Sequence, residues 1–122
     1  MNKQILMGAL LSLMGNAAFA EDASTYASLY QNHIIDDERV NGDTAKAEAF
    51  TDCHMMALGV FPESMQNEAF RVANATHSYD EARTAFSHLA AKEITASDER
   101  KAAIQSVIDE SKSLSDACLA GI

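Results

Sequence analysis

Helical periodicity runs through nearly the whole chain, and few residues are available to interrupt it. From residue 22 onward, apolar side chains recur three and four positions apart, as Tyr26, Leu29 and Tyr30 do. This spacing places them on one face of an α-helix. Only one proline and five glycines occur in 122 residues, and no stretch alternates apolar and polar residues as a strand would. The pattern predicts an all-α protein.

Local signals divide this helical chain into segments. The polar run over residues 36–39 should end a first helix that spans 22–36. Four residues have the properties of helix starts, namely Asp43, Pro62, Ser78 (which forms a capping box with Glu81) and Ser97. Because helices with short connections pack antiparallel, we expect a single-domain, up-and-down bundle of four to five helices.

The first twenty residues have the organisation of a secretory signal peptide. Lys3 provides a basic start, an apolar run follows over residues 5–14, and Ala18, Phe19 and Ala20 form an A-x-A cleavage signature. The apolar run is shorter than the roughly 20 residues that a membrane span needs. Residue 21 is Glu rather than the cysteine of a lipoprotein anchor. We expect a signal peptide over 1–20, a helical domain over 21–122, and a periplasmic protein without a membrane anchor.

The charge of the chain excludes some partners. Without Lys3, 8 basic and 18 acidic side chains remain, a formal charge of −10. Binding to nucleic acid depends on basic groups that displace counterions from phosphates, so we expect no nucleic-acid partner. A basic protein is the natural complement of such a surface, although an acidic excess also keeps a small exported protein in solution.

Two cysteines remain after the leader. Cys53 and Cys118 each lie on the predicted buried stripe of a helix. An oxidising compartment favours their pairing, so we predict a structural disulfide between them. A redox role would favour C-x-x-C spacing, which the chain lacks.

The stretch TDCHMMAL raises the question of a metal site. Cys53, His54, Met55 and Met56 are consecutive, and on a helix consecutive residues point about 100° apart, so they cannot bind one ion together. A site would need help from another helix, where the suppliers are His33, His77, His88 and Met65. We therefore predict no metal and no cofactor.

Motifs of enzyme chemistry do not occur. The chain has no G-x-S-x-G, no H-E-x-x-H, no phosphate-binding glycine loop and no C-x-x-C-H haem motif. The paired acids Asp36-Asp37 and Asp80-Glu81 fall at predicted helix ends, where carboxylates are ordinary. The chain is better explained as a binding protein than as an enzyme.

The chain combines a leader ending in AFA, an acidic helical domain of about a hundred residues, and cysteines within FTDCHMMAL and SDACLAGI. In these features it resembles the periplasmic immunity proteins of type VI secretion systems. The resemblance implies a small helical inhibitor, often dimeric, of a secreted peptidoglycan hydrolase of amidase or lysozyme type. Its partners would be that cognate effector, expected to be basic, and a second copy of the chain. The alternatives are an acid-stress chaperone of the periplasm and a haem-binding four-helix bundle.

In an up-and-down bundle the first and third connections emerge at the same end. Two groups of residues should then lie near one another there, forming an acidic rim beside an aromatic anchor: Asp36, Asp37, Glu38 and Asp43, and Tyr79, Asp80 and Glu81. Interface energy concentrates in aromatic residues while rim charges steer association, so we predict that these seven residues bind the partner. The end with Phe61, Pro62 and Glu63 near Asp98 and Glu99 is the rival surface.

Overall fold

The computed structural model describes residues 22–122, and the predicted leader and its cleavage site lie outside this range. Five helices occur in the described range. An N-terminal helix spans 22–34 and is followed by α2 (Thr44–Leu58), α3 (Glu63–Thr76), α4 (Tyr79–Ala96) and α5 (Asp98–Ala120). The prediction of an all-α single domain with one disulfide is confirmed.

The predicted helix starts are confirmed by their hydrogen bonds. The side chains of Asp43, Ser78 and Ser97 each accept a bond from a backbone N–H in the first turn of the helix that follows. Pro62 is the residue immediately before α3. The N-terminal helix ends at 34 rather than at the predicted 36, because the chain turns at residues 35–42 and uses a left-handed backbone at Asn41 and Gly42.

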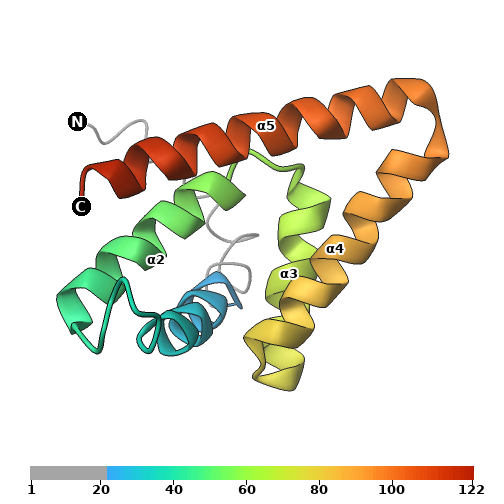
Figure 1. Ribbon diagram of the computed structural model, residues 1–122. Helices are drawn as coiled ribbons and strands as arrows, with labels where there is room; N and C mark the ends of the chain where they lie inside the picture. The colour runs from blue at the N-terminus through green and yellow to red at the C-terminus, as the bar shows by residue number, and fades with distance from the viewer. Residues whose placement is uncertain (1–21) are drawn as a thin grey trace, which may run out of the picture.

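Helix α5 organises the arrangement (Figure 1). It runs along one side of the molecule, with α2 packed beneath its C-terminal part and α4 leading away from its N-terminal end. Helix α3 packs on α4, and the N-terminal helix lies on the side of α2 away from α5. Since α2 and α4 both pack on α5 but diverge from it in different directions, a cleft is left beneath the middle of α5.

Two hydrophobic clusters hold the helices together. The larger joins the N-terminal helix to α2, α3 and α4 through buried residues that include Tyr26, Leu58 and Phe70. The smaller joins the end of the N-terminal helix to α2 and includes Val40, which is 1% exposed. Burial of such apolar side chains is the main stabilising term of the fold.

The predicted disulfide between Cys53 and Cys118 is present. Their Cα atoms are 5.6 Å apart, and Cys53 is buried. The bond fastens the end of α5 to the middle of α2 and is consistent with an oxidising compartment. No helix within 22–122 has the length and apolar character of a membrane span.

Candidate functional site

Five ring side chains meet between the N-terminal helix, α2 and α4. They are all three tyrosines of the chain and two of its four histidines, and we call them the aromatic cluster: Tyr26, Tyr30, His33, His54 and Tyr79. The N-terminal helix supplies three of these rings at positions i, i+4 and i+7, which share one face of a helix. Helix α2 supplies His54 and α4 supplies Tyr79. The cluster therefore links three helices.

His54 lies between two tyrosines. Its Nε2 atom is 2.6 Å from the hydroxyl oxygen of Tyr26, and the two groups share a hydrogen bond. The ring of Tyr30 stacks on the imidazole, with centroids 3.9 Å apart and planes inclined by 8°. This stacking covers one face of the histidine and withdraws it from water.

Burial determines the charge of His54. Desolvation lowers its pKa from 6.5 to about 4, because the imidazolium ion loses more hydration than the neutral ring does. At neutral pH the side chain is therefore uncharged. It enters its hydrogen bond with Tyr26 as a neutral ring.

The three tyrosines are also held in their neutral form. Burial is the main cause that raises the pKa of Tyr26, Tyr30 and Tyr79, and the proximity of the hydroxyls adds to the effect for Tyr26 and Tyr30. A protonated phenol is a poor base and a poor nucleophile at neutral pH. These three tyrosines are therefore suited to packing and hydrogen bonding.

A cleft of about 350 Å³ opens beside the aromatic cluster. Tyr26, His54 and Tyr79 line it, together with Phe61 and Phe86. The two phenylalanine rings meet edge to face with centroids 4.8 Å apart. The remaining lining residues are Ala57, Leu58, Arg83, Ile108, Ser111, Lys112, Ser115 and Asp116. A concave, mainly apolar site with a few polar groups has the general character of a ligand pocket.

Helix α5 is held over the cleft at two points on α2. The Ser111 hydroxyl donates a hydrogen bond of 2.9 Å to the carbonyl oxygen of Ala57, and Cys118 is bonded to Cys53. The face of α5 that meets the other helices is only partly buried, and Ile104 is its fully buried member. The half-covered face of α5 forms a wall of the cleft.

The predicted acidic residues of the first connection lie on one ordered segment, residues 35–43, which we call the acidic loop. Asp36 and Glu38 are exposed, and neither forms an ion pair within the described part of the chain. Asp37 binds Arg39 through both carboxylate oxygens, and this guanidinium lowers the pKa of Asp37 to about 2. Asp43 caps α2. Two of the four acids therefore have local structural partners.

The three predicted residues of α4 are placed differently from one another. The ring of Tyr79 packs in the aromatic cluster, 4.7 Å from that of His33. Asp80 is exposed and pairs with Arg83 at 3.7 Å, and the backbone N–H of Glu81 donates to Ser78. The structure thus brings Tyr79 beside the end of the N-terminal helix that leads into the acidic loop, but as a half-buried ring.

The aromatic cluster and the cleft were missed by the sequence interpretation. Periodicity placed Tyr26 and Tyr30 on one face of a helix, and His54 was considered as a candidate metal ligand. The available signal was composition, because a chain without tryptophan has just three tyrosines and places two of them four residues apart. That spacing shows a shared face but not which helix the face meets.

The consecutive residues of the CHMM stretch separate as helix geometry requires. Cys53 is in the disulfide, His54 is in the aromatic cluster, Met55 packs against the larger hydrophobic cluster, and Met56 is 47% exposed. Within residues 22–122, no three His, Cys, Asp or Glu side chains are grouped so that they could hold a metal ion.

Comparisons with known proteins give no further guide to the site. No family model, curated protein or solved structure matches the chain. The function is therefore inferred from the residues themselves.

Proposed function

We propose that the protein is a periplasmic inhibitor that binds a secreted, basic peptidoglycan hydrolase, as an immunity protein of a type VI secretion system does. The observation that carries this proposal is the acidic loop, a hydrogen-bonded and strongly acidic surface segment on a protein of formal charge −9. In the aromatic cluster behind this loop, burial keeps His54 and the three tyrosines uncharged at neutral pH, which suits these rings to packing and hydrogen bonding.

The acidic loop is preorganised by its own backbone. The N–H groups of Val40 and Asn41 both donate to the carbonyl oxygen of Asp37, and the N–H of Gly42 donates to that of Ile35. The side chain of Val40 is buried beneath the loop. A loop that is ordered before binding loses little conformational entropy on association. Little of the free energy gained by pairing its exposed carboxylates is then lost in ordering the loop.

Electrostatic complementarity then explains the choice of partner. An enzyme that acts on an anionic cell wall is expected to carry a basic surface, and an acidic inhibitor is steered toward it. Such steering raises the association rate and weakens as salt is added. Asp37 pairs with Arg39 and Asp43 caps α2, so Asp36 and Glu38 are the carboxylates of the loop without a local partner and are available to pair across an interface.

The test is a charge reversal of the acidic loop. The double variant Asp36→Lys with Glu38→Lys should associate more slowly than the parent with the proposed partner, a peptidoglycan hydrolase to be sought among the neighbouring genes. Its association rate should also depend less on salt than that of the parent. A matched control is Glu48→Lys with Asp52→Lys, which makes the same change of charge on exposed positions of α2. Circular dichroism checks that both variants are folded. This pair is sharper than Tyr79→Ala, which would also remove a ring from the aromatic cluster.

Each outcome bears on a separate part of the proposal. If the parent protein neither binds nor inhibits the hydrolase, the function is wrong. If the loop variant and the α2 variant bind as well as the parent, the acidic loop is not the interface. Loss of binding in the α2 variant alone would move the interface to the outer face of α2.

One observation favours a second candidate, an acid-stress chaperone. His54 is half-buried as a neutral ring, so acid opposes the packing of the aromatic cluster and favours exposure of the apolar surface beneath it. A chaperone of this kind should suppress aggregation of an unrelated client at pH 4 but not at pH 7, and equal effects at both pH values would exclude it.

A further inference from the structure

The cleft contains a guanidinium that has free hydrogen-bond donors. Binding of a partner by the acidic loop does not involve this group. Arg83 of α4 lines the cleft together with the aromatic rings. We propose that the cleft is a binding site for a small aromatic carboxylate, whose ring packs against Phe61 and Phe86 and whose carboxylate binds Arg83.

Arg83 differs from the other arginines of the described chain. Arg39, Arg71 and Arg100 each donate two hydrogen bonds to a single carboxylate, those of Asp37, Glu68 and Glu93 respectively. Arg83 makes no such forked pair within residues 22–122, and its one ionic contact is with exposed Asp80 at 3.7 Å. An exposed ion pair at that separation is weak, so the guanidinium remains able to donate two hydrogen bonds to the carboxylate of a ligand.

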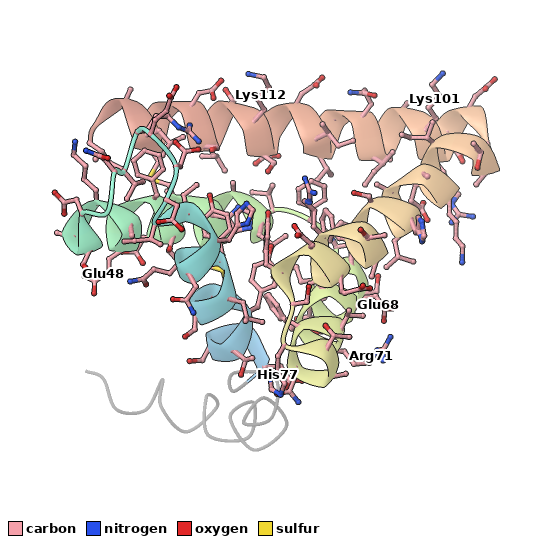
Figure 2. The ribbon with its side chains drawn as sticks, turned by 60° about the horizontal axis from the view of Figure 1, so that its bottom comes forward. Glu48, Glu68, Arg71, His77, Lys101 and Lys112 are labelled. Carbon is pink, nitrogen blue, oxygen red and sulfur yellow. A yellow bond between two sulfur atoms is a disulfide. The ribbon has the colours of Figure 1, made fainter. Side chains whose placement is uncertain are left out.

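The other cation at the cleft is already engaged. Lys112 of α5 binds Asp116 at 2.9 Å, and Figure 2 shows its side chain extending outward from α5, away from the other helices. Arg83 is therefore the group that gives the cleft a local preference for an anion, although the protein as a whole is acidic. Asp116 also lines the cleft, but its carboxylate is paired with Lys112, so these two charges offset one another and Arg83 supplies the remaining positive charge of the lining.

The residues that line the cleft favour a ligand whose apolar part is an aromatic ring. Five of the lining side chains are rings, namely Tyr26, His54, Phe61, Tyr79 and Phe86. Ring pairs prefer edge-to-face or offset contacts, and Phe61 and Phe86 already meet edge to face. The volume of about 350 Å³ is at the lower end of the usual range for ligand pockets, so the occupant is small. His54 and the tyrosines are neutral, and so do not repel a carboxylate.

The experiment titrates 3-phenylpropionate into the disulfide-intact protein and follows backbone amide shifts by two-dimensional NMR. A ligand of this size should bind with a Kd on the order of 1 mM, and the shifts should concentrate in residues lining the cleft. The variant Arg83→Gln should bind about tenfold more weakly, the scale of one charge-assisted hydrogen bond. Arg71→Gln, on α3 and outside the cleft, is the matched control and should bind as the parent does.

A neutral probe separates charge from packing. 3-Phenylpropan-1-ol has the same ring and chain without the carboxylate, so it should bind more weakly than the acid to the parent and equally to the parent and Arg83→Gln. The proposal is overturned if the acid causes no shifts at the cleft, if Arg83→Gln and Arg71→Gln bind it alike, or if the alcohol binds the parent as tightly as the acid. None of these results depends on whether a hydrolase binds the acidic loop.

Discussion

The burial of His54 predicts a loss of stability in mild acid. The unfolded chain exposes this side chain, whose ordinary pKa is 6.5, whereas the folded protein lowers its pKa to about 4. Below pH 6.5 the unfolded state therefore binds a proton that the folded state does not, and the free energy of unfolding falls as the pH falls. Below pH 4 both states are protonated and the loss levels off.

The size of the effect follows from these two pKa values. One pKa unit corresponds to about 1.36 kcal/mol, so the loss relative to neutral pH should reach about 2 kcal/mol at pH 5 and about 3 kcal/mol at pH 4. A domain of this size is stabilised by about 5 to 15 kcal/mol in all, so the loss is a substantial fraction of its stability.

The assay is urea unfolding at a series of pH values between 7 and 4, followed by far-ultraviolet circular dichroism. His54→Gln removes the titrating group and keeps an acceptor for the Tyr26 hydroxyl, so its stability should fall less steeply with acid than that of the parent. His88→Gln is the matched control, because His88 is exposed on α4 and its variant should follow the parent curve.

The test compares how steeply the free energy of unfolding changes with pH in the parent and in His54→Gln. His54→Gln also changes packing against Tyr30, which shifts its curve by a constant amount without changing the slope. Parallel curves for the parent and His54→Gln between pH 7 and pH 5 would refute the reasoning. NMR titration of the ring protons would then show whether His54 is protonated near pH 6.5 after all.

Two predictions concern covalent and backbone constraints. The denatured, unreduced protein should show no reactive thiol, and labelling of two thiols would contradict the disulfide. Replacement of Cys53 and Cys118 by serine should lower the free energy of unfolding by about 4 kcal/mol, because the bond closes a loop of 65 residues. Gly42→Ala should cost about 1 kcal/mol, since Gly42 has a φ of +79° and an added Cβ would meet no atom within 4 Å, so backbone strain is the whole cost. Gly121→Ala, at a φ of −83°, is the control in urea unfolding, and an equal loss in both variants would show that the left-handed turn is not the cause.

Local sequence signals determined the helices of this protein. Asp43, Ser78 and Ser97 identify three helix starts because a cap requires a short side chain to reach a backbone N–H only three residues away. The disulfide could also be predicted, since the two cysteines of the chain fall on the buried faces of their helices and leave one possible pairing. The first helix was predicted two residues too long because helix ends depend weakly on local sequence.

The candidate sites depended on contacts between helices. Periodicity places Tyr26 and Tyr30 on one face, but the meeting of that face with His54 of α2 and Tyr79 of α4 follows from how α2 and α4 diverge beneath α5. The same divergence opens the cleft and leaves Arg83 at its edge without a forked carboxylate partner. Spacing along a chain defines the faces of each helix, whereas crossing directions arise from the packing of side chains distant in sequence. For that reason the helices and the disulfide were determined by the sequence, while the aromatic cluster and the cleft were decided by the tertiary structure.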